Sequence, residues 1–270
     1  MITLHEVELP LLTSGEPISF LHLSDLHVTP RQKGKLEDLL ELSTYEPDFT
    51  IVTGDFLAHH DAIEPLIKAL SGLLHRPGAF VFGSNDYYAP KLKNPFSYLM
   101  RDTGKRKLGP ELPWRELQEQ LINHGWIDLN HQKTVIKIQN HVIELRGTDD
   151  AHLSRDDYSR VAGPKNSQAE ISIGVTHAPY QRILDAMARD SVDLIFAGHT
   201  HGGQVRLPLP DFLGGSRALT TNCDLPTWRS RGLSVEERKP WLHVSAGIGT
   251  SPYAPFRFGT TPEATLVTIL

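Results

Sequence analysis

Two histidines separated by one residue follow an apolar run in the last third of the chain. Residues 192–196 have the composition of a buried strand, and Gly198 marks its end just before His199 and His201. Two imidazoles this close together in a tight loop can point at one small volume. Neutral imidazole is a common ligand of Zn, Mn, Fe and Ni. The segment therefore predicts a buried strand that delivers metal ligands at its carboxyl end.

Four other predicted strands also end on polar side chains of this kind. After strands 18–24, 49–54, 79–83 and 171–176, the polar residues are, in order, Asp25 and His27, Asp55, Asn85 and Asp86, and His177. In open α/β sheets, functional groups gather at the carboxyl ends of the strands. We therefore expect all of these side chains to meet His199 and His201 at one edge.

The chemistry of this set favours a pair of divalent metal ions. Carboxylate and imidazole ligands without thiolates suit Mn, Fe, Zn or Ni, and two such ions need a shared bridging carboxylate. Each motif taken alone is commonly a turn, a helix cap or a solvated loop. Five of them in order, each after a strand, are better explained by a dinuclear metal site.

The order of these motifs resembles that of the calcineurin-like metallophosphoesterases. The segments that carry the resemblance are Asp25-x-His27, Gly54-Asp55, Gly83-x-Asn85-Asp86, Thr176-His177 and Gly198-His199-x-His201. Residues 247–251 and 257–259 are similar to the bacterial branch that includes YkuE-like and YaeI-like enzymes. The resemblance extends from Phe20 to Leu270. It implies an α/β fold with four layers (α/β/β/α), in which two mixed sheets pack face to face. The sequence has no internal repeat and no linker, so we expect a single domain, residues 1–270.

The resemblance also implies a role for each residue of the set. Asp55 would bridge the two ions, with Asp25, His27 and His201 at one ion and Asn85, His177 and His199 at the other. The implied catalytic residues are Asp55, Asn85, Asp86 and His199, and Asp86 would orient a ligand or the bound water. The implied reaction is hydrolysis of a phosphomonoester or phosphodiester by a hydroxide shared between the ions.

The third motif departs from the family pattern. Most members have Gly-Asn-His followed by Asp or Glu, whereas this chain has Gly83-Ser84-Asn85-Asp86. An ungapped match makes Ser84 the metal ligand, and a shift of one residue makes it Asn85. We expect Asn85, because an amide oxygen is the better ligand.

The histidine that assists the leaving group in the family is absent from this motif. Either another residue supplies the acid, or the leaving group needs none. His59 and His60, just after Asp55, are candidates. The alternative is that they only open the next helix.

Composition restricts the partners. With 27 basic and 32 acidic residues the net charge is −5, so no general positive field attracts nucleic acid, and a nuclease-type phosphodiesterase is the weaker alternative. The single cysteine, Cys223, is typical of a reducing compartment. Residues 1–6 lack the pattern of a signal peptide, and no apolar run is long enough to span a membrane. We therefore expect a cytoplasmic protein.

Two segments with the character of insertions, residues 87–113 and 206–232, combine basic and apolar side chains. The first contains Lys91, Lys93, Arg101, Lys105, Arg106, Lys107, Tyr87, Tyr88, Phe96 and Tyr98; the second contains Leu207, Leu209, Phe212, Leu213, Trp228, Arg206, Arg217, Arg229 and Arg231. Such side chains can hold a phosphorylated ligand or contact an anionic membrane surface peripherally. The hypothesis is a phosphorylated lipid or lipid-linked substrate. Ordinary solvated loops are the alternative.

A function of another class also fits the third motif. A non-catalytic module that binds metal or a phosphorylated ligand would tolerate the change at Ser84 and Asn85. The other ligand positions, all present, favour an enzyme.

The remaining pattern alternates strands and helices. Helices are predicted at 35–42, 62–74 with Asp61 as N-cap, 114–124 and 178–189. A hairpin is predicted at 135–146, with its turn at Asn140 and His141, and strands are predicted near Val205 and at 241–245 and 265–270.

Overall fold

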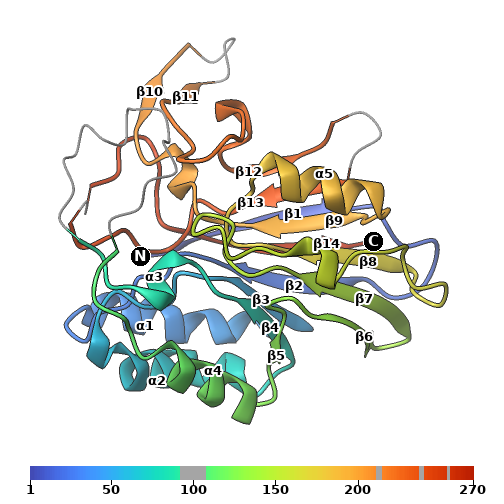
Figure 1. The fold of residues 1–270 in the computed structure, drawn as a ribbon, viewed down its shortest axis with the longest axis horizontal. Coiled ribbons are helices and arrows are strands. Elements are labelled where there is room, and N and C mark those ends of the chain that lie inside the picture. Colours follow the sequence, from blue (N-terminus) through green and yellow to red (C-terminus); the bar gives the residue numbers. More distant parts are fainter. Residues whose placement is uncertain (92–107, 211–214, 237–239, 254–255) are drawn as a thin grey trace.

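The computed structural model describes residues 1–91, 108–210, 215–236, 240–253 and 256–270. Within these residues, two six-stranded sheets pack face to face, and helices cover their outer faces. Figure 1 shows α1, α2 and α4 on one side of the pair and α5 on the other. This confirms the predicted four-layer α/β sandwich.

The first sheet has a parallel centre. Its strands, in spatial order, are β1 (Thr3–Leu9), β14 (Glu263–Ile269), β2 (Ile18–Leu23), β3 (Phe49–Thr53), β4 (Gly78–Val81) and β5 (Ile127–Asp128). Pairing is parallel from β2 through β5, whereas β14 runs antiparallel to β2. The carboxyl ends of β2, β3 and β4 therefore lie at the same edge.

The second sheet is also mixed. Its strands, in spatial order, are β12 (Gly232–Ser234), β13 (Trp241–Val244), β9 (Leu194–Ala197), β8 (Ile171–Val175), β7 (His141–Gly147) and β6 (Lys133–Ile138). Strands β13, β9, β8 and β7 are parallel to one another. The predicted hairpin is confirmed as β6 and β7, which run antiparallel.

Apolar side chains from both sheets form the central core. The Phe20 ring lies 5.9 Å from the ring of Phe49 in its own sheet and 6.2 Å from that of Phe196 in the other, measured between centroids. Strands buried on both faces are nearly continuous in apolar residues, which is why the motif-bearing strands were recognisable as apolar runs. This core fixes the two sheets against each other.

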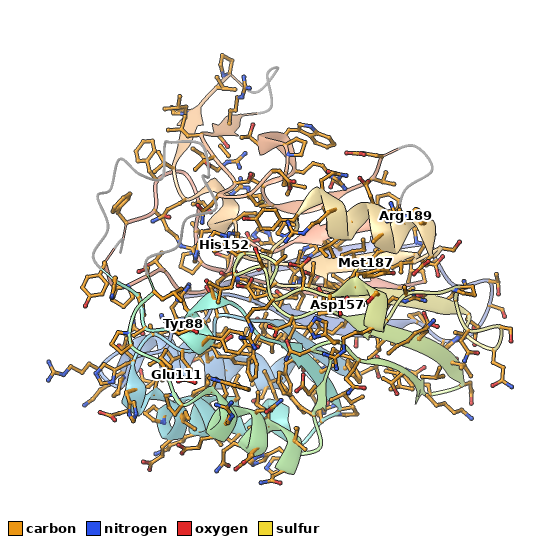
Figure 2. All side chains as sticks on the ribbon, viewed as in Figure 1. Tyr88, Glu111, His152, Asp157, Met187 and Arg189 are labelled. Atoms are coloured by element: carbon orange, nitrogen blue, oxygen red, sulfur yellow. The ribbon has the colours of Figure 1, made fainter. Side chains whose placement is uncertain are left out.

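Amphipathic helices cover the outer faces. The helices are α1 (Lys33–Glu41), α2 (Ile63–Leu74), the short α3 (Ser84–Tyr87), α4 (Trp114–Asn123) and α5 (Gln181–Arg189). Helix α2 buries Leu66, Leu70 and Leu73 at helical spacing. Figure 2 shows Met187 and Arg189 on α5, where Met187 is buried against the second sheet and Arg189 is exposed.

Short elements complete the described chain. The 3₁₀ helices are η1 (Leu42–Tyr45), η2 (His60–Ala62), η4 (Tyr158–Arg160), η5 (His201–Gly203) and η7 (Thr227–Arg229), and a small antiparallel pair is formed by β10 (Arg206–Pro208) and β11 (Ser216–Ala218). The predicted N-cap Asp61 is wrong. His59 instead caps η2, its Nδ1 accepting a hydrogen bond from the Asp61 N–H at 3.1 Å, and η2 leads into α2.

A search of the described residues finds no helix with the length and apolar character needed to cross a bilayer.

The contact between the sheets predicts a large loss of stability on truncation of Phe20. Phe20→Ala should lower the free energy of unfolding by about 3–5 kcal/mol, because the cavity lies in a core that both sheets enclose. Val135→Ala, at a half-exposed position on β6, is the matched control and should cost under about 1 kcal/mol. Denaturant unfolding measures both. Equal losses would contradict a shared core centred on Phe20.

Candidate metal centre and active site

The strand ends predicted to converge do so, but they come from two sheets. The loops after β2 and β3 supply Asp25, His27 and Asp55, and the loops after β8 and β9 supply His177 and His201. His27 Nε2 lies 3.5 Å from Asp55 Oδ2, His177 Nε2 lies 3.6 Å from Asp55 Oδ1, and His201 Nε2 lies 3.6 Å from Asp25 Oδ1. The cluster therefore occupies the edge where the two sheets meet.

These groups are suited to hold cations. Ligand atoms of Asp25, His27 and His201 lie within 4.8 Å of one another, as do those of Asp25, Asp55 and His177. Asp25 Oδ1 and both ring nitrogens of His27 are buried without a hydrogen-bond partner. Buried polar atoms normally have partners, and a divalent ion would satisfy these. Asp55 faces His27 with one oxygen and His177 with the other, so it lies where a bridging ligand is needed.

His177 is oriented as a metal ligand by a backbone contact. Its Nδ1–H donates to the carbonyl of Thr53 at 2.6 Å, which leaves Nε2 pointing at Asp55. Burial opposes its protonation, but the charges of Asp55, Asp25 and Asp150 outweigh this and raise the pKa of His177 to about 9. A proton on His177 thus neutralises part of the acidic cluster, and a metal ion would replace it.

Two other imidazoles of the cluster stay neutral near pH 7. Burial, and then the charge of His177, lowers the pKa of His199 to about 3. Burial also lowers the pKa of His201 to about 4, against the opposing charge of Asp25. Both rings can therefore offer a lone pair to a cation.

The backbone at the ligand positions is held in an uncommon conformation. The angle φ is positive at Asp25 (51°), His27 (44°), Asp55 (56°), His199 (70°) and His201 (49°). Non-glycine residues in this region each cost of order 1–3 kcal/mol and persist where the surroundings enforce them. Glycines make the required space: a Cβ on Gly83 would lie 2.3 Å from Asp55 Oδ1, and one on Gly198 would lie 1.8 Å from Ser24 Oγ.

Asp86 holds the Asp55 loop. Its carboxylate accepts hydrogen bonds from the backbone N–H groups of Asp55 (2.8 Å), Phe56 (2.7 Å), Leu57 (3.2 Å) and Gly83 (2.8 Å). Burial and the charge of Asp55 raise its pKa to about 8, whereas the N–H donors favour the ionised form. Both oxygens are thus committed to the backbone. This makes Asp86 a positioning residue for Asp55, and its role in orienting a ligand or water stays a prediction.

The geometry of the third motif favours Asn85 over Ser84 as the ligand. The Asn85 backbone N–H donates to Asp55 Oδ1 at 2.8 Å, and its Nδ2 donates to Asp55 Oδ2 at 2.6 Å. A half-turn of this amide presents its oxygen at the same place, beside the carboxylate predicted to bridge the ions. Ser84 Oγ lies 3.5 Å from Asn85 Nδ2.

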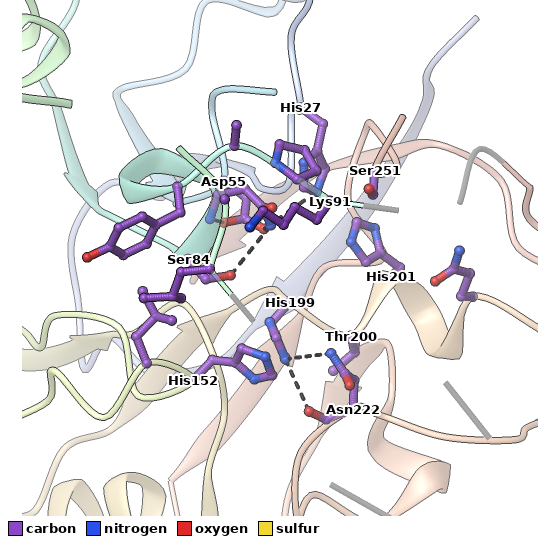
Figure 3. A pocket seen from close by; sticks show the side chains of 18 of the residues that line it. His27, Asp55, Ser84, Lys91, His152, His199, Thr200, His201, Asn222 and Ser251 are labelled. Atoms are coloured by element: carbon purple, nitrogen blue, oxygen red, sulfur yellow. Dashed lines mark hydrogen bonds and ion pairs between the residues drawn. The ribbon is translucent and has the colours of Figure 1, made fainter. Parts of the chain in front are cut away.

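A cleft of about 100 Å³ opens over the cluster (Figure 3). Its walls include two residues that the sequence motifs did not identify, His152 and Asn222. Asn222 O and Nδ2 each lie 3.3 Å from His199 Nε2, and the His152 and His199 ring centroids are 4.3 Å apart. His152 follows β7 through Gly147, Thr148, Asp149 and Asp150, a strand end with the glycine and acidic residues of the other motifs. That similarity is the signal that could have identified it.

The proposed acids His59 and His60 are not in this cleft. Their side chains are 51% and 73% exposed, and neither is among the residues that line it. His59 caps η2, and His60 contacts Asp61. The alternative interpretation, that they open the next helix, agrees with the structure.

Comparison with known proteins gives the family. The model of the calcineurin-like phosphoesterases matches residues 18–203, which is more than half of the chain. The chain belongs to this family, whose members hydrolyse phosphoric ester bonds with divalent metal ions. Both the predicted superfamily and the predicted enzyme class are thereby confirmed.

Relatives agree with the predicted bacterial branch. The uncharacterised metallophosphoesterase YkuE of Bacillus subtilis is 24% identical over 99% of this chain and 84% of its own length. Phosphodiesterase YaeI of Escherichia coli is 27% identical over 73% and 65%. UDP-2,3-diacylglucosamine pyrophosphatase LpxG of Chlamydia trachomatis is 26% identical over 94% and 82%.

Asp55→Asn should abolish turnover of phosphoesters and lower the metal content of the purified protein. A neutral amide offers one ligand oxygen, which cannot bridge two cations as a carboxylate does. Asp61→Asn, on the exposed loop that follows, is the control and should retain both. Elemental analysis and a Mn²⁺-supported assay on an aryl phosphodiester measure the outcome. Near-normal activity with two metals per chain would contradict the role of Asp55.

Asp86→Asn should lower metal affinity and stability together. The amide keeps one acceptor oxygen but places an NH₂ group against backbone N–H donors, which costs of order 1–3 kcal/mol. Isothermal titration with Mn²⁺ and denaturant unfolding report the two effects. A variant with normal stability and metal affinity but reduced turnover would instead favour direct contact with the ligand.

Proposed function

We propose that this enzyme hydrolyses the phosphoester of a lipid-linked substrate at an anionic membrane surface, with two divalent ions in the cleft. The observation that carries the proposal is an exposed apolar face beside the metal-ligand cluster. It lies on the small sheet of β10 and β11, joined by a parallel bridge between Val205 and Phe258.

Strand register places the apolar side chains of this small sheet on one face. Leu207 pairs with Arg217, and the Leu219 N–H donates to Val205 O at 3.1 Å, so Val205 and Leu219 are the next opposed pair. Since side chains alternate along a strand, Val205, Leu207, Leu219 and Phe258 share one face with Arg217; we call these four apolar residues the apolar rim. Leu207, Leu219 and Phe258 are 49%, 40% and 58% exposed.

Two of the arginines expected to face the membrane do not do so. Arg206 points to the opposite, buried side of the small sheet, where its guanidinium bonds Ser216, Ser230 and the carbonyl of Gly202. Arg229 is buried against Ser234 and Glu236. Their charges serve internal hydrogen bonds that the sequence pattern does not reveal.

The remaining members of the two insertion-like segments divide into three groups. Arg217, Arg231 and Trp228 are exposed, and Leu209 is half-buried. Tyr87 is buried, and Tyr88 and Lys91 line the cleft. The expected contacts of Lys93, Phe96, Tyr98, Arg101, Lys105, Arg106, Lys107, Phe212 and Leu213 lie outside the described residues.

The apolar rim adjoins the cleft directly. Gln204 and Thr220, which line the cleft, are the chain neighbours of Val205 and Leu219. A substrate with its phosphoryl group over the metal ligands could therefore lay an acyl chain along the rim. The relative LpxG is named for a substrate that is diacylated and contains a diphosphate, which supports the same combination here.

In this proposal, most of the site residues hold the metal ions, and one lysine contacts the substrate phosphate. Asp25, His27 and His201 would hold one ion, Asn85, His177 and His199 the other, and Asp55 both. When bound, the ions would polarise a phosphoryl oxygen and lower the pKa of the attacking water. The cleft residue Lys91 can meet a further phosphate oxygen as a point charge.

The double variant Leu207→Ser/Phe258→Ser should separate surface binding from catalysis. Each apolar side chain buried in a lipid surface is worth about 1.5–3 kcal/mol, so binding to anionic phospholipid vesicles should fall at least about tenfold. Turnover of a soluble aryl phosphodiester with Mn²⁺ should stay unchanged. Co-sedimentation with anionic and with neutral vesicles, at low and high salt, measures the binding.

The wild-type protein should bind anionic vesicles more tightly than neutral ones, and salt should weaken that binding. Val135→Ser, an exposed apolar position on β6, is the matched control and should bind as wild type does. Absence of binding at low salt would leave a soluble small-molecule phosphoester as the better substrate.

A further inference from the structure

A histidine outside the sequence motifs lines the cleft beside the second predicted ion site. His152 lies in the loop after β7, the strand parallel to and beside β8, whose own loop carries His177. Its side chain is buried at 8% exposure and packs against the ring of His199. Figure 3 shows it beside His199, across the cleft from His201. The fold thus brings one more imidazole to the reaction site.

Hydrogen bonds to the backbone and to the ring position His152. The Asp150 carboxylate accepts hydrogen bonds from the backbone N–H groups of His152 and Leu153, each at 3.0 Å, which shapes the loop. Tyr180 Oη lies 3.2 Å from His152 Nδ1. Where the Tyr180 hydroxyl is the donor in this contact, the ring proton lies on Nε2, at the other side of the imidazole. The ring is therefore oriented by groups that belong to the second sheet.

The third motif lacks the histidine that assists the leaving group in the family, so another imidazole in the cleft could take that function. It has Ser84 and Asn85 where the family pattern has a histidine, and both residues share the cleft with His152. His59 and His60 lie outside the cleft lining. Among the described histidines that line the cleft, His27, His199 and His201 belong to the predicted ion sites, and His152 does not.

We propose that His152 is a catalytic residue that donates a hydrogen bond through Nε2–H to the oxygen of the leaving group. A water oxygen forms the new bond to phosphorus while the bond from phosphorus to the leaving oxygen breaks. The electron pair stays on the leaving oxygen, which the Nε2–H stabilises. The proton lost by the water reaches the leaving group through solvent. The proposal rests on the proposed function only in placing the phosphoryl group over the metal ligands.

A series of soluble aryl phosphoesters with leaving groups of rising pKa tests this role. His152→Ala should lower kcat about 10²- to 10³-fold for the poorest leaving groups, and only a few-fold for nitrophenol. His152→Gln, which can place an N–H near the position of Nε2, should recover part of the loss. The slope of log kcat against leaving-group pKa should be shallow in the wild type and steep in His152→Ala.

Two further measurements keep the test decisive. His124→Ala, an exposed histidine at the end of α4, is the control and should keep the wild-type slope. Metal content should be unchanged in His152→Ala. An equal loss for all leaving groups, or a loss that follows metal content, would overturn the proposal and make His152 a packing partner of His199. Failure of the lipid proposal would show only in vesicle binding, since these esters are soluble.

Discussion

Two buried carboxylates, Asp25 and Asp55, face imidazoles at the edge where the two sheets meet, and this arrangement requires compensating positive charge. Burying a carboxylate without a partner costs several kcal/mol even after relaxation. Without metal, the raised pKa of His177 lets a proton supply part of that charge. With divalent ions bound, the same side chains would become ligands. The edge of the fold and the metal centre are therefore one electrostatic unit, and the positions of both sheets are tied to it.

The local backbone shows how the chain meets this requirement. Parallel strands from different sheets cannot all aim their side chains at one point in extended conformation, so the chain turns sharply just after each strand. Asp25, Asp55 and His199 make these turns with positive φ. Gly83 and Gly198 remove the Cβ atoms that would collide with the ligands. These strained backbone conformations persist because the core between the sheets and the hydrogen bonds of Asp86 hold the loops in place.

Residues that directly follow a strand could be predicted from the sequence. Residues whose positions are set by tertiary contacts could not. The convergence of the predicted ligands could be predicted, because a polar residue directly after an apolar strand lies at the strand's carboxyl end, where parallel strands of a sandwich bring such residues together. His152 lies five residues beyond the end of β7, in an irregular loop whose path is fixed by Asp150 and Tyr180, and no local periodicity reports that path. Arg206 and Arg229 lie in a segment whose basic and apolar residues resemble a membrane-facing surface, yet hydrogen-bond partners within the same part of the chain bury both. Asp61 was predicted as the N-cap, but His59 caps η2 instead. Helix propensity does not decide between two candidate caps this close in the chain.

A set of contacts links the third motif to the loop that carries His152, although the two follow strands of different sheets. Tyr87, two residues after Asn85, donates through its hydroxyl to Asp149 Oδ1 at 2.7 Å, and Arg155 Nε donates to Asp149 Oδ2 at 2.9 Å. The Arg155 guanidinium also stacks over the Tyr87 ring, 3.9 Å from its centroid. Burial and the charge of Asp149 raise the pKa of Tyr87, so its hydroxyl remains a donor. Asp149 is therefore held from both sides, and these contacts link α3 to the loop that carries His152. A motif that has lost its own histidine is in this way tied to the loop that brings one from the opposite sheet.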